Sequence, residues 1–126
     1  MEIKFLLLDH VLKIHQDQIQ RYGGTPGIRD INSLKSALNT PSVTYDGQLL
    51  HATAYEMAAA YLFHVVKNHP FIDGNKRTGA VTAMTFLLIN GHSLVVNNED
   101  LVEITLLVVQ NKLSKAELAT NIKNWI

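Results

Sequence analysis

The eleven residues from His69 to Gly79 carry an imidazole, a carboxylate, an amide, two cations and two glycines. They follow a strongly apolar segment, residues 52–66, and lead directly into another, residues 80–89. This context predicts a loop that opens into the N-terminus of a helix. No other stretch of the sequence is as rich in reactive side chains.

Residues 74–77 have the composition of a phosphate-binding site. The first N–H groups of a helix lack internal partners and, together with the helix dipole, attract anions. Gly74 lets the backbone approach a ligand closely, and the Asn75 amide can both donate and accept hydrogen bonds. Lys76 supplies a mobile point charge and Arg77 a planar fork. We therefore predict that these four residues cradle phosphate.

Asp73 and His69 extend the predicted site toward catalysis. A carboxylate beside bound phosphate would be repelled unless a divalent cation lay between them, and Mg²⁺ is held by one or two carboxylates plus phosphate oxygens. A histidine ordinarily titrates near neutral pH, so His69 suits a general base that removes a proton from an attacking hydroxyl. Base, metal ligand and phosphate anchor together indicate transfer of a nucleotide-derived group to a hydroxyl.

Each of these residues also has a purely structural interpretation. A histidine before proline often only ends a helix, and Asp-Gly-Asn is a common turn. The ordered set favours a site, because a simple turn does not need two consecutive cations at the start of an apolar helix. The other histidines are interpreted as surface or core residues rather than zinc ligands, since pairs five residues apart do not share a helix face: His10, His15, His51, His64 and His92.

The composition bounds the rest of the molecule. With 126 residues, 47% of them hydrophobic, the chain is expected to form a single domain over residues 1–126 with one core. Eleven basic and eleven acidic residues balance, so we expect no direct binding of nucleic acid. The N-terminal residues lack the pattern of a secretory signal, and no apolar run approaches the ~20 residues of a membrane span. We expect a soluble, cytoplasmic protein without membrane contact.

Hydrophobic periodicity and turn residues predict an all-α fold, a compact bundle of about six helices with a short β-flap and minor edge strands. The segments 52–67 and 75–90 are apolar nearly all round and belong in the middle of the bundle. The Asp46-Gly47 step predicts a hairpin within residues 42–50. Short strands are expected at residues 3–6 and 93–96, where they could pair with each other. The remaining helices are expected at 9–22, 31–38, 98–109 and from 115 onward.

The nine residues from His69 to Arg77 resemble the signature of the Fic/Doc family, which reads H-P-F-x-D/E-G-N-G/K-R. Residues 21–24 and 27–30, with the overall length, resemble the short Doc (death-on-curing) toxins of Phd/Doc modules. The resemblance implies that Phe71 anchors the loop in the core and that His69 is the base. It also implies that Asp73 is the magnesium ligand. The residues that it implies as contacts of the phosphates of ATP are Gly74, Asn75, Lys76 and Arg77.

Two positions depart from the pattern of most Fic proteins, which transfer AMP to a hydroxyl. Lys76 stands where those proteins carry glycine, and Ala80 stands where they carry a second arginine. The Doc branch shares both features, and its members are kinases that phosphorylate elongation factor Tu. The resemblance therefore implies a toxin that transfers the γ-phosphate of ATP to a threonine or serine hydroxyl of a translation factor and arrests translation. AMP transfer, or a catalytically silent partner-binding domain, are the alternatives.

The resemblance also implies a protein partner. Many Fic proteins restrain themselves with an inhibitory helix of pattern S/T-x-x-x-E-G/N, which has no match in this sequence. We therefore expect inhibition in trans, by a Phd-like antitoxin that folds on an apolar groove. The 42–49 flap lies where family members pair a target peptide as an added strand, although a plain surface loop is an equal interpretation.

Overall fold

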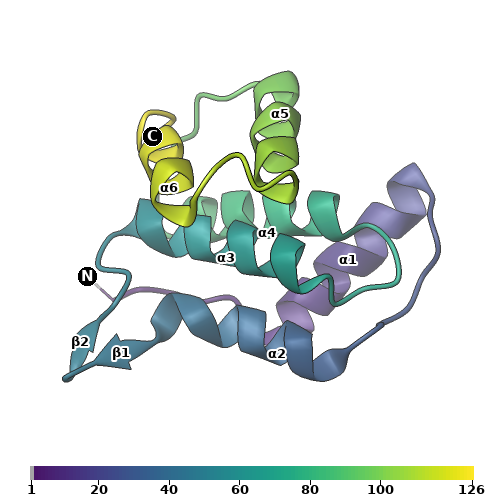
Figure 1. Cartoon of the computed structure of the whole chain (residues 1–126), viewed down its shortest axis with the longest axis horizontal. Helices are drawn as coiled ribbons and strands as arrows, with labels where there is room; N and C mark the ends of the chain where they lie inside the picture. Colours follow the sequence, from purple (N-terminus) through teal and green to yellow (C-terminus); the bar gives the residue numbers. More distant parts are fainter. Residues whose placement is uncertain (1) are drawn as a thin grey trace.

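The computed structural model describes residues 2–126, which form α-helices and one small hairpin (Figure 1). The prediction of an all-α fold with about six helices and a short β-flap is confirmed. No helix in the described part of the chain is long and apolar enough to cross a membrane. The elements are α1 (Leu8–Tyr22), α2 (Ile31–Asn39), the 3₁₀ turn η1 (Thr40–Ser42), β1 (Thr44–Tyr45), β2 (Gln48–Leu49), α3 (Ala54–Asn68), α4 (Asn75–Ile89), α5 (Asn98–Val109) and α6 (Lys115–Lys123).

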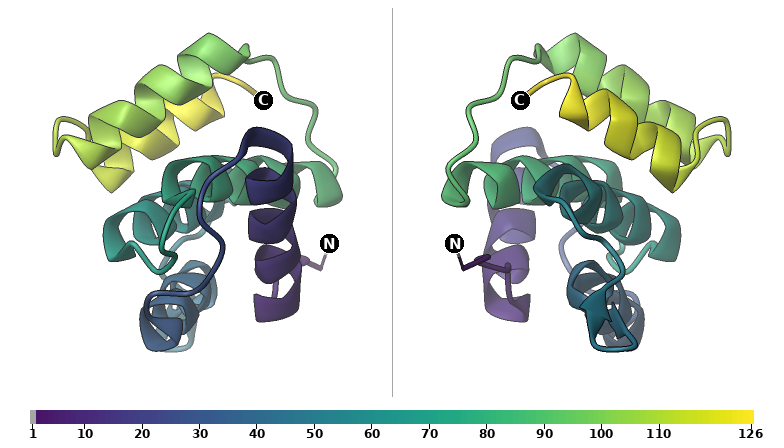
Figure 2. Two further views of the ribbon diagram at one scale, coloured as in Figure 1. Left: turned by 90° about the vertical axis from the view of Figure 1, so that its right-hand side faces the viewer. Right: turned by 90° about the vertical axis from the view of Figure 1, so that its left-hand side faces the viewer.

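Helices α3 and α4 lie side by side in the middle of the molecule, between α5 and α6 on one side and α1 and α2 on the other (Figures 1 and 2). This is the position that their all-round apolar sequences predict. Their largest fully buried side chains include Tyr61 and Phe86, whose rings pack 5.1 Å apart. At Gly79 the two helices come very close, because a Cβ added there would lie 3.0 Å from Val66 Cγ2 and 3.3 Å from the Leu62 carbonyl oxygen.

Predicted helix starts and turns are present with their expected hydrogen bonds. The Asp30 side chain accepts from the N–H groups of Asn32 and Ser33 and so caps α2. Ser114 and Glu117 form the reciprocal capping box of α6. These local signals explain why the observed helix boundaries lie within two residues of those the sequence indicates, as at α3, which begins at residue 54 rather than 52.

The β-flap is a two-stranded antiparallel hairpin in which Thr44 pairs with Leu49 and Tyr45 with Gln48. Its two-residue turn, Asp46-Gly47, has positive φ at both positions, as the Asp-Gly step predicts. Within the described residues this hairpin is the whole of the regular sheet. All four paired residues are exposed, so the flap projects from the bundle with its outer backbone groups free of a neighbouring strand.

The predicted edge strands are wrong: among residues 2–126, neither the 3–6 segment nor the 93–96 segment forms a strand. The backbone of residues 3–6 instead bonds to side chains, namely the Asn90 amide at the end of α4 and the Tyr61 hydroxyl of α3. In the 93–96 segment one N–H donates to the Trp125 carbonyl. In the 3–6 segment, side chains thus satisfy backbone groups that the sequence pattern assigned to strand pairing.

Candidate functional site

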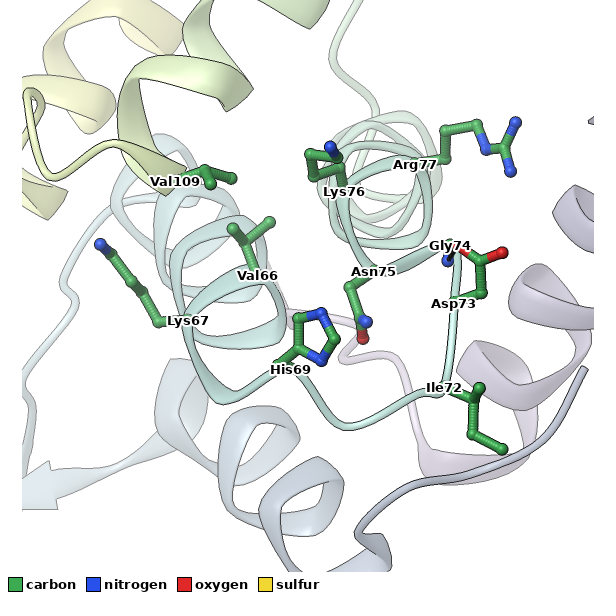
Figure 3. A pocket seen from close by; sticks show the side chains of 10 residues that line it. All are labelled: Val66, Lys67, His69, Ile72, Asp73, Gly74, Asn75, Lys76, Arg77 and Val109. Atoms are coloured by element: carbon green, nitrogen blue, oxygen red, sulfur yellow. Dashed lines mark hydrogen bonds between the residues drawn. The ribbon is translucent and has the colours of Figure 1, made fainter. Parts of the chain in front are cut away.

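A cavity of about 600 Å³ opens where the C-terminus of α3 meets the N-terminus of α4 (Figure 3). A volume of this size is typical of small-molecule sites. The motif loop, which we define as residues 69–77, brings every residue predicted for the site to this cavity. The lining residues are Val66, Lys67, His69, Ile72, Asp73, Gly74, Asn75, Lys76, Arg77 and Val109.

His69 ends α3 in a left-handed backbone conformation, with φ 49° and ψ 53°. Non-glycine residues rarely adopt this conformation, because the Cβ comes too close to the following carbonyl. The side chain is exposed and its ring projects from the end of α3 toward the start of α4 (Figure 3). An imidazole in this position is accessible to a hydroxyl that enters the cavity.

The first turn of α4 is open to an anion. Its N-cap is Gly74, and no side chain in the described chain caps the helix. The first N–H groups of α4 therefore lack the side-chain partner that most helices supply, and Lys76 adds an exposed cation in the same turn. Backbone donors, helix dipole and ammonium together make this end of the cavity suitable for phosphate.

Asn75 holds the loop rather than presenting its amide to the cavity. Its side chain is buried, accepts a hydrogen bond from the Phe71 N–H and donates one to the Phe71 carbonyl, both at 2.9 Å. The sequence predicts that Asn75 contacts phosphate. Because its amide bonds to Phe71, this stays a prediction for the backbone N–H of Asn75. The side chain closes a tight loop around residues 71–75, and this fixes the direction in which α4 begins.

Phe71 is fully buried, as the family resemblance implies, and it stacks on His15 of α1 with ring centroids 3.7 Å apart. The His15 Nε2 atom lies 2.8 Å from the Asp73 carbonyl oxygen, so this nitrogen carries the ring proton and donates it. The sequence analysis placed His15 only among surface or core residues. Its contact with the motif connects positions 58 residues apart, which no local pattern reveals.

The Asp73 carboxylate points away from His69, toward the connection between α1 and α2 (Figure 3). It accepts hydrogen bonds from the N–H groups of Thr25, at 3.1 Å, and Gly74, at 2.8 Å. These two donors hold the pKa of the Asp73 carboxyl below its usual value, because they stabilise the charged form. Asp73 is therefore an exposed anion at the rim of the cavity.

Arg77 also faces the α1–α2 connection. Its Nη2 donates to the Gly23 carbonyl at 3.0 Å, and the guanidinium lies over the Tyr22 ring, 5.3 Å from the ring centroid. Lys76 and Arg77 thus leave α4 in different directions (Figure 3). The Arg77 guanidinium uses one of its five N–H donors on the Gly23 carbonyl, so the others remain for a phosphate.

Residues 23–30, which we call the α1–α2 strap, contact the whole length of the motif loop. Besides the bonds to Asp73 and Arg77, the Gly27 carbonyl accepts from the Ile72 N–H, and the N–H groups of Arg29 and Asp30 both donate to the Pro70 carbonyl. The Arg29 side chain bonds the carbonyls at the end of α3. The sequence of this segment resembles the family pattern, but its residue types alone do not indicate a role in the site.

Comparison with known proteins shows the relatives of this chain. The model of the Fic/DOC family matches residues 5–87. The chain is 40% identical over 73 residues to a protein named Toxin Doc from Mycolicibacterium smegmatis, a match that covers 58% of this chain and 56% of that relative. It is 26% identical over 115 residues to Protein kinase doc from Escherichia phage P1, covering 91% of this chain and 90% of that relative.

Proposed function

Because this chain belongs to the Fic/DOC family, we propose that it is a toxin of a type II toxin–antitoxin pair that transfers the γ-phosphate of ATP to a threonine or serine hydroxyl. The relatives named Toxin Doc and Protein kinase doc support this proposal. The observation that carries it is the meeting, in one cavity, of an exposed histidine, an exposed carboxylate and the uncapped start of α4. By resemblance, the target is a translation factor, elongation factor Tu.

In the proposed reaction, His69 acts as the general base. Its unprotonated ring nitrogen takes the proton of the target hydroxyl while the hydroxyl oxygen attacks the γ-phosphorus. One O–P bond forms, the bond between the γ-phosphorus and the bridging oxygen breaks, and ADP leaves with that bond's electron pair. The N–H groups that begin α4 and the Lys76 ammonium stabilise the charge that accumulates on the transferred phosphoryl oxygens.

Asp73 has the chemistry of a magnesium ligand in this reaction. Its pKa is lowered, so the carboxylate is charged at neutral pH, and each oxygen keeps a lone pair beyond the one that accepts its N–H bond. The described residues contain no group of three or more His, Asp or Glu side chains arranged for a metal. Phosphate oxygens and waters would therefore complete the coordination, which is the usual situation for Mg²⁺ with nucleotides. When bound, Mg²⁺ neutralises phosphate charge.

Two positions favour phosphate transfer over AMP transfer. Lys76 is exposed in the first turn of α4 and fills space that a glycine would leave for phosphate. Ala80 cannot supply the second guanidinium with which AMP-transferring relatives hold the γ-phosphate. The proposal thus follows the Doc branch of the resemblance, with AMP transfer as the alternative outcome of the test below.

The test supplies the chain and purified elongation factor Tu with ATP labelled at either the α or the γ phosphate. We expect label from the γ position only, loss of transfer in His69→Ala, and retained transfer in His92→Ala, a histidine distant from the motif in sequence. Transfer from the α position would replace kinase by AMP transferase. Undiminished transfer by His69→Ala would remove the general-base role.

We also propose a Phd-like antitoxin as the inhibitory partner. Another cavity, of about 330 Å³, adjoins Lys76 and Arg77, and α4 and α5 contribute apolar side chains to its lining, such as Val81, Val102 and Leu106. An amphipathic segment that covered it would meet both cations of the predicted site. Growth arrest on expression, relieved by co-expression of the neighbouring gene, tests this pairing; arrest that no neighbour relieves contradicts it.

A further inference from the structure

We propose that Arg29 is a positioning residue that holds the backbone of His69 in its left-handed conformation and so aims the imidazole at the cavity. The catalytic consequence of this inference rests on the proposed function, whereas its structural part does not. Arg29 lies in the α1–α2 strap, 40 residues away from His69 in sequence, and none of its side-chain atoms lines the cavity.

The conformation of His69 needs support from outside its own segment. Helices commonly end with a left-handed residue, but that residue is usually glycine, which pays no Cβ penalty. His69 carries a Cβ and also precedes Pro70, and residues before proline favour extended backbone. Left to local preference, residue 69 would extend, and its side chain would then leave the end of α3 in another direction.

Arg29 supplies that support through consecutive carbonyls. Its Nε–H donates to the His69 carbonyl at 2.6 Å, and its Nη2–H donates to the Asn68 carbonyl at 2.9 Å. The backbone N–H groups of Arg29 and Asp30 bind the next carbonyl, that of Pro70, at 2.7 and 3.0 Å. Three successive peptide groups around the histidine are thus fixed by one short piece of the strap.

The guanidinium is suited to this role by shape and by charge. Carbonyls at the end of a helix lack internal partners and carry the negative end of the helix dipole, so a cation there is favourable. Two donors held in one plane fix the relative orientation of two neighbouring carbonyls, which the single mobile ammonium of lysine does not do. Arg29→Lys should therefore keep the charge and lose the orientation.

The variants Arg29→Lys and Arg29→Gln test the inference, with Arg21→Lys as the matched control. Arg21 is an exposed arginine of α1 whose guanidinium pairs with Asp17 of the same helix. Arg29 is exposed too, and the backbone bonds of the strap remain in every variant. We expect all three variants to fold, with thermal melting confirming it.

The first measurement is made on the full chain alone, without nucleotide or target. The ¹³Cα and ¹³Cβ shifts of residue 69 report its backbone conformation, and relaxation dispersion reports exchange on the μs–ms timescale. In both Arg29 variants we expect residue 69 to shift toward extended values or to exchange, while Arg21→Lys keeps the wild-type signals. Wild-type shifts without exchange in Arg29→Gln would overturn the inference.

The second measurement is transfer of the γ-phosphate to elongation factor Tu. A displaced base lowers kcat, so we expect kcat to fall about 10- to 100-fold in Arg29→Gln, less in Arg29→Lys, with the KM for ATP changed less than about twofold. A fall of equal size in kcat and affinity for ATP would indicate general damage and contradict a positioning role. If the wild-type chain transfers no label at all, the proposed function fails, and the shifts of residue 69 still decide whether Arg29 holds the histidine.

Discussion

Acidification should weaken this fold through His64, a residue of α3 outside the predicted site. The Lys115 ammonium at the start of α6 donates to His64 Nε2 at 3.1 Å, so the neutral ring carries its proton on Nδ1. Protonation of Nε2 would break this bond and place two positive charges together. Burial first, and then the charges of Lys115 and His51, lower the pKa of His64 to about 4.

The sign and size of the effect follow from this pKa. The ordinary value is 6.5, so between pH 6.5 and pH 4 the unfolded chain binds a proton that the folded chain does not. Stability therefore falls as the pH drops through this window and is unaffected by His64 above it. Without solvent screening, a His64 pKa lowered from 6.5 to about 4 means that about 2 kcal/mol of unfolding free energy is lost at pH 5 relative to pH 7.5. His64 is partly exposed, so solvent screening leaves an expected loss of ~1–2 kcal/mol.

Urea unfolding near pH 7.5 and near pH 5 measures this loss in the wild type and in His64→Gln. The glutamine keeps an acceptor for Lys115 but does not titrate, so the pH dependence should shrink by ~1–2 kcal/mol. A residual dependence of the same sign is expected from His51, whose pKa is also lowered by burial and by Lys115, with Glu56 opposing. Lys115→Gln should raise the pKa of His64, whereas Lys112→Gln, at an exposed lysine, should not.

Two results would refute this reasoning. One is an equal pH dependence of the unfolding free energy in the wild type and in His64→Gln. The other is an NMR titration of the His64 ring with a midpoint near 6.5 in the folded chain. Either result would mean that α6 neither shields His64 from water nor places the charge of Lys115 close enough to lower its pKa.

Substitutions at two positions, each with a comparison variant, test the geometry in and around the motif loop. Gly24→Ala would place its Cβ 2.7 Å from Asp73 Oδ2, so the magnesium concentration needed for half-maximal transfer should rise about tenfold. Gly23→Ala is the control, because Gly23 also has positive φ but a Cβ there has no neighbour within 4 Å among the described residues. Its magnesium requirement should stay near the wild-type value. Asn75→Ala leaves the buried N–H and carbonyl of Phe71 without partners, so urea unfolding should show a loss of about 2–4 kcal/mol. Asn75→Asp keeps the acceptor for the Phe71 N–H but sets a buried carboxylate oxygen against the Phe71 carbonyl oxygen, so it should lose at least as much stability as Asn75→Ala. An unchanged unfolding free energy in either variant would contradict the two-bond account.

The parts of the molecule that the sequence predicts are those set by local rules. Periodicity placed all six helices, and the Asp46-Gly47 turn placed the flap, because helix caps and hairpin turns depend on residues a few positions apart. The predicted site residues all lie between positions 69 and 77 of the sequence, so a single loop and the helix start that follows it bring them near one another. Burial of Phe71 followed in the same way from the resemblance of that loop to a known signature.

What the sequence could not predict depends on contacts between distant segments. The bonds from Thr25 to Asp73 and from Arg77 to Gly23 join positions 48 and 54 residues apart, and no periodicity encodes them. The predicted strand at residues 3–6 failed for the same reason, because Asn90, 86 residues after Lys4, satisfies its backbone. The burial of the Asn75 amide against Phe71 could not be predicted either, because residue type alone does not tell whether an amide faces a ligand or its own loop.

Gly79 gives the cavity a property that its lining residues do not reveal. It lies outside the cavity, yet Val66, one of the side chains that a Cβ at position 79 would push, forms part of the cavity wall. The close approach of α3 and α4 beside this wall thus depends on the absence of a side chain at position 79. A side chain at position 79 would therefore change the shape of the cavity through Val66, although residue 79 does not line it.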